Sequence, residues 1–120
     1  MATLLVTCSL VVNIGVAGTM GAAILNPRSL PALRIDVVFG PDTPARRILA
    51  CLYLAIAGVS GVALAHAPWR LAVVRVLFPL QIAYKVATAA VVSLASNPVP
   101  RWNLAIAALH MVSLAQAARL

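Results

Sequence analysis

Long apolar runs alternate with short polar stretches along the chain. The runs cover residues 2–25, 45–65, 70–95 and 101–118. A bilayer core about 30 Å thick requires about 20 apolar helical residues, and each run supplies roughly that number. Two of the connections are short enough to make neighbouring helices antiparallel. The pattern therefore predicts an all-α membrane protein, a four-transmembrane-helix antiparallel bundle, formed by the single domain 1–120.

The connection between the first two runs, residues 26–44, is longer and differs in composition. It begins at Asn26-Pro27 and ends at Thr43-Pro44, where a hydroxyl N-cap followed by proline is typical of a helix start. Its prolines argue against one continuous helix. Its middle, residues 33–39, is too apolar to extend freely into water. We expect this loop to lie in the membrane interface or to fold back on the mouth of the bundle. A hairpin strand and a docking surface for a partner are the alternatives.

The overall composition supports the membrane class. Hydrophobic residues make up 63% of the chain and charged residues 9%, and the mean hydropathy is +1.04. Soluble domains carry about a quarter charged residues, so this chain cannot cover a water-soluble surface. The same numbers exclude disordered, collagen-like and disulfide-rich classes. Cys8 and Cys51 form no Cys-x-x-Cys motif, so neither a dithiol redox centre nor a zinc site is indicated.

The basic residues predict an orientation rather than a nucleic-acid partner. The net charge is +7, but the arginines are spread between the apolar runs and no groove-reading motif is present. The first and third connections collect five arginines against three on the other side. By the positive-inside rule, loop 26–44 is cytoplasmic and both termini lie outside. We expect an integral protein of the bacterial inner (cytoplasmic) membrane, with Trp69 and Trp102 as interfacial anchors.

Lys85 is the most informative polar residue, because it lies at least ten residues, or about 15 Å, from either end of the third run. A charge at the bilayer centre costs about 2.5–3.5 kcal/mol, so Lys85 should face the bundle interior. Gln81, Tyr84 and Thr88 share its helix face by their spacing. Both acidic residues lie in loop 26–44, so either the loop folds in, or Lys85 is neutral and hydrogen-bonded, or it meets an anionic or carbonyl-bearing ligand.

Other polar residues recur at a similar depth in the remaining runs. Asn13 lies in the middle of the first run with Ser9 one turn earlier, and His110 lies in the middle of the fourth. Further polar stripes comprise Tyr53 and Ser60 in the second run, and Asn103, Ser113 and Gln116 in the fourth. We predict that Asn13, Lys85 and His110 meet. The predicted ligand- or partner-binding residues are Lys85, His110, Tyr84, Gln81 and Asn13.

The alternative for these polar residues is purely structural. Side-chain hydrogen bonds between transmembrane helices contribute about 0.6–1.7 kcal/mol each and occur without any ligand. We expect neither catalytic nor metal-binding residues, because no acid accompanies His110 and no His/Cys/Asp/Glu cluster is present. Glycines recur at Gly15, Gly18 and Gly21, and at Gly58 and Gly61. Small residues of this kind predict close helix packing within the chain, with dimerisation as the alternative.

Two segments resemble the DoxX family of small four-helix membrane proteins. They are residues 45–54, ARRILACLYL, a basic and then apolar helix start with a tyrosine, and residues 79–85, PLQIAYK, a proline-led helix with glutamine, tyrosine and lysine. The resemblance covers residues 45–95 and implies the four-helix architecture. Members of that family are linked to quinone-associated redox membranes or have no assigned role. The chain lacks paired cysteines, so we transfer the architecture and not a redox activity.

The sequence leads to two functional hypotheses. The first is a non-enzymatic accessory or structural subunit that packs against a larger membrane complex or its lipids or pigments, with membrane lipids and other integral subunits as partners. The second is a stand-alone binder or carrier of a small lipophile such as a quinone, held at the mid-membrane polar site. A proton relay through Lys85 and His110 is a third and weaker one, because it lacks a carboxylate. We expect no built-in cofactor beyond a bound lipid, quinone or pigment.

Overall fold

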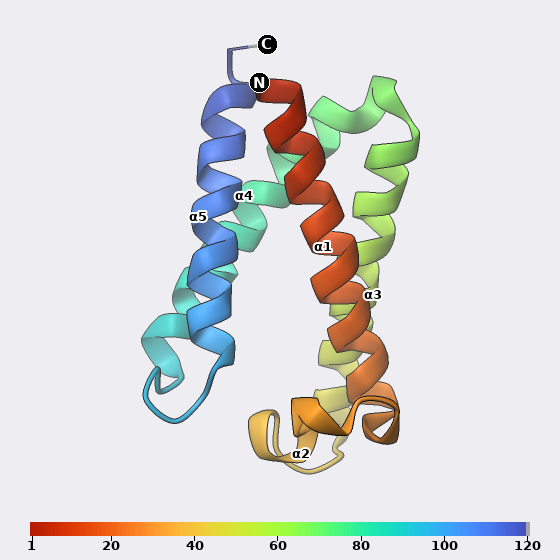
Figure 1. The fold of residues 1–120 in the computed structure, drawn as a ribbon, viewed down its shortest axis with the longest axis vertical. Helices are drawn as coiled ribbons and strands as arrows, with labels where there is room; N and C mark the ends of the chain where they lie inside the picture. The colour runs from red at the N-terminus through yellow and green to blue at the C-terminus, as the bar shows by residue number, and fades with distance from the viewer. Residues whose placement is uncertain (120) are drawn as a thin grey trace.

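Four long helices form the body of the protein in the computed structural model, which describes residues 1–119. They are α1 (Ala2–Leu25), α3 (Pro44–Ala65), α4 (Ala67–Val91) and α5 (Val99–Ala117). The helices alternate in direction, so both termini lie at one end, the terminal end, and the two longer loops lie at the other, the loop end (Figure 1). Residues 1–119 contain no strand, and the predicted all-α class is confirmed.

Three of the long helices, α1, α3 and α4, are long and apolar enough to cross a membrane. The fourth long helix, α5, is not among these candidates: it has only 19 residues, and several of them are polar. These side chains are Arg101, Asn103, His110 and Gln116. Three of the four predicted spans are therefore confirmed as candidates by length and composition, and the fourth stays a prediction.

The helix ends agree with the sequence where a cap or proline marks them. The hydroxyl oxygen of Thr43 accepts from the backbone N–H of Arg46 over 3.3 Å, and Pro44 is the first residue of α3, so the predicted cap is confirmed.

The bounds of the third and fourth helices differ from the prediction. The third helix was predicted over residues 70–95, whereas α4 runs from Ala67 to Val91. Pro68 fits in the first turn because a proline there costs no helical hydrogen bond. The helix ends where Val92 becomes extended, although the apolar sequence continues. The fourth helix likewise starts two residues early, at Val99.

The loop between α1 and α3 folds into short helical turns beneath these two helices (Figure 1). It contains the 3-10 helices η1 (Pro27–Ser29) and η2 (Pro31–Leu33) and the short helix α2 (Ile35–Val38). Ile35 is 2% exposed, and Leu33 and Phe39 pack with it against α1 and α3. The ring of Phe39 meets that of Tyr53 edge-on, with 6.4 Å between the centroids. The apolar middle of the loop is thus folded back on the bundle rather than paired as a strand.

Arg46 fastens this loop to the start of α3. Its buried guanidinium donates to the carboxylate of Asp36 and, over 2.6 Å, to the carbonyl of Gly40. Asp42 accepts two bonds from the exposed Arg47, at 2.9 and 2.7 Å. The hydrogen bonds and charge of Arg47, with a further contribution from Arg46, hold the pKa of the Asp42 carboxyl below its ordinary value. Both acidic side chains of the protein are therefore engaged with arginines at the loop end.

The long helices form a ring in which α1 contacts α3 and α5, and α4 contacts the same two helices. One glycine permits a close approach in this ring. A Cβ on Gly21 would lie 2.7 Å from Cγ of Leu54 and 3.0 Å from the carbonyl oxygen of Ala50, so α1 and α3 touch there. Gly15, Gly58 and Gly61 have open space at the same position, so the prediction that all these glycines serve close packing is wrong for three of them.

The two loops of the loop end are joined by Asn97. Its side-chain amide donates to the carbonyl of Val38 over 2.9 Å, and its side-chain oxygen accepts from the N–H of Val99 at the start of α5. The α1–α3 pair and the α4–α5 pair diverge toward this end (Figure 1). The divergence leaves the space in which the candidate site lies.

Candidate functional site

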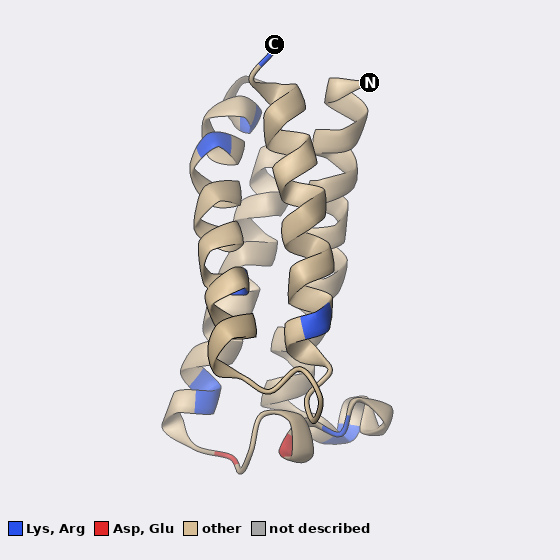
Figure 2. Cartoon of the chain, turned by 90° about the vertical axis from the view of Figure 1, so that its left-hand side faces the viewer, with Lys and Arg blue, Asp and Glu red and all other residues tan. Residues whose placement is uncertain are grey.

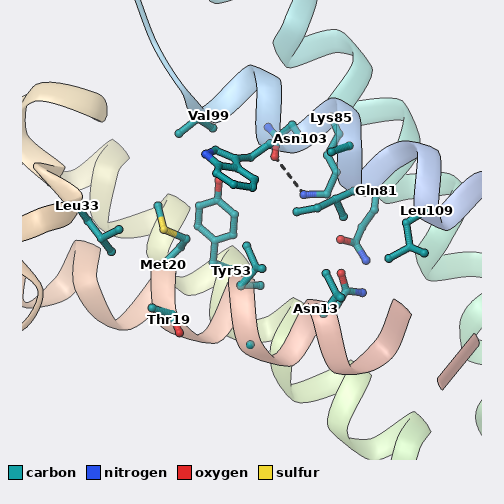
Figure 3. Close-up of a pocket in the computed structure, with 17 residues that line it drawn as sticks. Asn13, Thr19, Met20, Leu33, Tyr53, Gln81, Lys85, Val99, Asn103 and Leu109 are labelled. Atoms are coloured by element: carbon teal, nitrogen blue, oxygen red, sulfur yellow. Dashed lines mark hydrogen bonds between the residues drawn. The ribbon is translucent and has the colours of Figure 1, made fainter. Parts of the chain in front are cut away.

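A cavity of about 630 Å³, here called the lateral pocket, lies between the two helix pairs. Most of its lining comes from α1 and α5, with contributions from η2, α3 and α4 (Figure 3). The lining residues that are exposed belong to α1 and α5, so the mouth opens sideways between these helices; they are Gly15, Val16, Thr19, Trp102 and Ala105. Ligand sites in proteins typically enclose about 300–1,000 Å³ and combine apolar walls with a few polar groups.

Four buried polar side chains line the inner part of the lateral pocket: Asn13, Gln81, Lys85 and Asn103. They lie on the buried faces of α1, α4 and α5. The hydroxyl of Tyr53 points into the same space from α3 (Figure 3). The rest of the lining is largely apolar. The lateral pocket thus combines a polar interior with apolar walls.

Lys85 is 4% exposed and has a neutral partner. Its Nζ donates to Oδ1 of Asn103 over 3.2 Å and lies 4.9 Å from the centroid of the Tyr84 ring. An ammonium group has three protons to donate, and Asn103 accepts one of them. Because both aspartates are bound to arginines at the loop end, no side-chain carboxylate is left to neutralise Lys85. The pocket therefore contains a lysine side chain without an acidic side chain beside it.

A separate hydrogen-bonded chain joins α1, α3 and α5 beside the pocket. Oδ1 of Asn13 lies 3.0 Å from Nε2 of His110, and Nδ2 of Asn13 donates to Oγ of Ser60 over 3.1 Å. The His110 ring stacks on Phe78, with centroids 4.4 Å apart and 11° between the planes. Oγ of Ser9 and Oγ of Ser113 lie 2.7 Å apart nearer the terminal end. These contacts fit the structural role of interhelical polar bonds.

The five sequence-predicted residues therefore separate into three groups. Asn13, Gln81 and Lys85 line the lateral pocket. His110 bonds to Asn13 but is not part of the lining, and Tyr84 lines a different cavity between α3 and α4. Of the three residues expected to meet, Asn13 and His110 are hydrogen-bonded to each other, whereas Lys85 bonds to Asn103.

The sequence did not single out Asn103 as the partner of Lys85, nor Tyr53 and Trp102 as lining residues. Asn103 lies on the same stripe as His110, two turns earlier. Which of these two residues meets Lys85 depends on how far α5 is displaced along α4. That displacement is set by tertiary packing, so the spacing alone carried no signal for it.

The interior of the pocket is rich in hydrogen-bond donors. Lys85 has unused protons, the Asn103 amide nitrogen is free of protein partners in the described chain, and Nε2 of Gln81 is buried without a partner. Such donors match carbonyl, carboxylate or phosphate oxygens. Residues 1–119 contain no group of three or more His, Cys, Asp or Glu side chains placed to hold a metal ion. The arrangement suits binding of an acceptor-bearing end group.

Comparisons with protein families, curated proteins and solved structures give no match to this chain. The resemblance to the DoxX family stays a prediction, and the class of the protein is defined by its fold and by the lateral pocket.

Proposed function

We propose that this chain is a four-span integral membrane protein that holds a lipophilic molecule by a polar end group in the lateral pocket. The observation that carries the proposal is the buried, uncompensated Lys85 at the inner end of an apolar pocket that opens sideways. An apolar ligand body would contact the walls, and oxygen atoms of its end group would accept from Lys85, Asn103 and Gln81.

Membrane insertion of α5 as the fourth span is part of this proposal. Its polar residues Asn103, His110 and Ser113 are buried against the other helices, so its outer face is more apolar than its composition suggests. The packing of α5 against two of the three candidate spans, α1 and α4, supports its insertion beside them. A polar residue that is bonded inside a bundle does not meet lipid, which lowers the cost of inserting its helix.

We further propose that the loop end faces the cytoplasm of a bacterial cell. The arginines gather at this end (Figure 2): it holds Arg28, Arg34, Arg46, Arg47 and Arg101, against Arg70, Arg75 and Arg119 at the terminal end. Single cysteines at Ser29 and at Ala118, in a Cys8→Ala/Cys51→Ala background, would report the orientation. A membrane-impermeant thiol reagent added to intact cells should label Ala118→Cys and spare Ser29→Cys until the cells are lysed. The reverse pattern would contradict this orientation.

Purification in mild detergent tests the binding function directly. Lipid extraction and mass spectrometry should find a lipophile with an oxygen-bearing end group bound to the wild-type protein. The Lys85→Met variant should lose most of it, whereas Arg75→Gln, which removes an exposed cation outside the pocket, should retain it. A folded Lys85→Met protein with wild-type occupancy would overturn the proposal.

The accessory-subunit hypothesis gives a different result in the same purification. It predicts fixed protein partners in constant ratio, an empty lateral pocket, and loss of the chain when the partners are deleted. We propose a non-enzymatic protein in either case, because the two aspartates are engaged at the loop end and His110 has only Asn13 as its side-chain hydrogen-bond partner among residues 1–119.

A further inference from the structure

A second cavity, of about 490 Å³, lies between α3 and α4. We call it the α3–α4 cavity. Because the helices form a ring, the gap between α3 and α4 is on the opposite side of the bundle from the gap between α1 and α5. Its lining is aliphatic apart from Tyr53, Gln81 and Tyr84. Leu52 and Leu80 are exposed, so this cavity also opens toward the lipid-facing surface.

Among residues 1–119, only Tyr53 and Gln81 belong to the linings of both cavities. They form the wall between the lateral pocket and the α3–α4 cavity. Neither side chain is held by a hydrogen bond to another described residue, and Nε2 of Gln81 is left buried without a partner although the side chain is 1% exposed. Both side chains extend toward the lateral pocket (Figure 3). A wall of two unbonded side chains can part by rotamer changes without breaking a polar contact.

A buried amide N–H without an acceptor is costly unless a partner satisfies it at some stage. Tyr84, which lines the α3–α4 cavity, also has a buried hydroxyl without a hydrogen-bond partner among the described residues. The protein thus leaves two donors without acceptors in this region. An oxygen atom of the end group bound at Lys85 would supply the acceptor that Nε2 of Gln81 lacks.

We infer that the α3–α4 cavity receives the hydrocarbon tail of the molecule whose end group is bound at Lys85. The inference rests on the proposed function and specifies its ligand class: a single-chain amphiphile with a carboxylate or similar anionic end group. The tail would pass between Tyr53 and Gln81. Lys85 selects the anionic end, and the aliphatic lining of the α3–α4 cavity matches a hydrocarbon chain.

Quenching of tryptophan fluorescence by brominated fatty acids tests this arrangement. Trp102 lines the lateral pocket, and Trp69 lies outside both cavities, so Trp69→Phe leaves a reporter of the lateral pocket. Leu52→Trp in a Trp69→Phe/Trp102→Phe background reports the α3–α4 cavity. Val76→Trp in the same background is the matched control, because Val76 is an exposed α4 residue outside both linings.

Stearic acid brominated near its carboxyl group should quench Trp102, and stearic acid brominated near its methyl end should quench Leu52→Trp. Both signals should saturate at one ligand per protein, while Val76→Trp should show only weak, non-saturating quenching. Bromooctanoic acid should quench Trp102 but not Leu52→Trp, because its chain is too short to cross the wall. Lys85→Met should weaken both stearate signals at least tenfold. If that variant fails to fold, competition replaces it: stearate should displace the probes and stearylamine should not.

The outcomes separate the two proposals. Stoichiometric quenching of Trp102 with no quenching of Leu52→Trp above that of Val76→Trp would overturn this inference and leave the proposed function standing. Absence of saturable quenching at both reporters, in proteins with the wild-type circular dichroism spectrum, would overturn both. Displacement by stearylamine as effective as that by stearate would contradict the anionic end group.

Discussion

The ammonium group of Lys85 on α4 donates to the side-chain oxygen of Asn103 on α5 over 3.2 Å, and both side chains are buried. Asn103 is a neutral amide, so the contact is not an ion pair. The two partners are unequal, because a buried ammonium group is costly to leave without an acceptor, whereas a buried amide is not costly to the same degree.

The first prediction compares the two partners. Asn103→Leu should lower the free energy of unfolding by about 2 kcal/mol, because it leaves a buried cation with no protein acceptor. Lys85→Met should cost less than about 1 kcal/mol, since it removes the charge together with the bond. Thermal unfolding of the purified variants in the same detergent checks this. A larger loss for Lys85→Met than for Asn103→Leu would contradict the description of Lys85 as an uncompensated cation.

The second prediction concerns the chain through Asn13. Asn13→Leu removes bonds to both His110 and Ser60, whereas Ser60→Ala removes one. With about 0.6–1.7 kcal/mol for each interhelical bond, the first variant should be about twice as destabilising as the second. Thr19→Val, on the same helix but exposed and without a side-chain bond in the described chain, serves as the control and should leave the melting temperature unchanged. Equal losses for Asn13→Leu and Ser60→Ala would show that the bond to His110 contributes nothing.

The third prediction contrasts two helical glycines. An added methyl group at Gly21 would overlap Leu54 and approach the carbonyl of Ala50, so Gly21→Ala should destabilise the protein by about 1–3 kcal/mol. Gly58 has open space around the same position, and Gly58→Ala should be neutral or stabilising by up to about 1 kcal/mol, because alanine favours a helix. Opposite signs in unfolding measurements would confirm the close approach of α1 and α3. Equal changes in the free energy of unfolding for the two variants would contradict a close contact between α1 and α3 at Gly21.

The fourth prediction concerns pH at the loop end. The pKa of Asp42 should lie below its ordinary value of 3.8, chiefly because Arg47 donates to the ionised carboxylate. A lowered pKa means that the ion pair stabilises the folded loop above about pH 3.8 and that this contribution is lost as the pH falls through the folded value. A carbon-13 NMR titration of the side-chain carboxyl in micelles measures it. Arg47→Gln should raise the Asp42 midpoint, and an unchanged midpoint would refute the assignment to Arg47.

Local sequence signals were sufficient to predict a helix boundary where the residues themselves fix the backbone conformation. Thr43 and Pro44 marked the start of α3 because a cap and a fixed φ act within one turn. The end of α4 was not predictable in the same way. Val91 and Val92 are equally apolar, and the helix stops between them without a glycine or proline to mark it.

The sequence predicted which polar residues are buried in the interior better than it predicted which of them contact one another. A charge or amide in a span must face inward, which identified Asn13, Gln81 and Lys85 as interior residues. Their partners depend on the rotation and displacement of whole helices. Hence Lys85 bonds to Asn103 rather than lying beside His110, and Tyr84 faces a second cavity although it follows the same stripe as Gln81.

The hydrogen bond from Asn97 to the carbonyl of Val38 ties the two loops together at the loop end, while the mouth of the lateral pocket lies between α1 and α5. In the proposed membrane setting, a molecule would enter and leave by lateral diffusion within one leaflet. Its occupancy would then follow its mole fraction among the surrounding lipids rather than its concentration in water. The fraction of protein with a bound molecule would therefore depend on the lipid composition of the surrounding membrane.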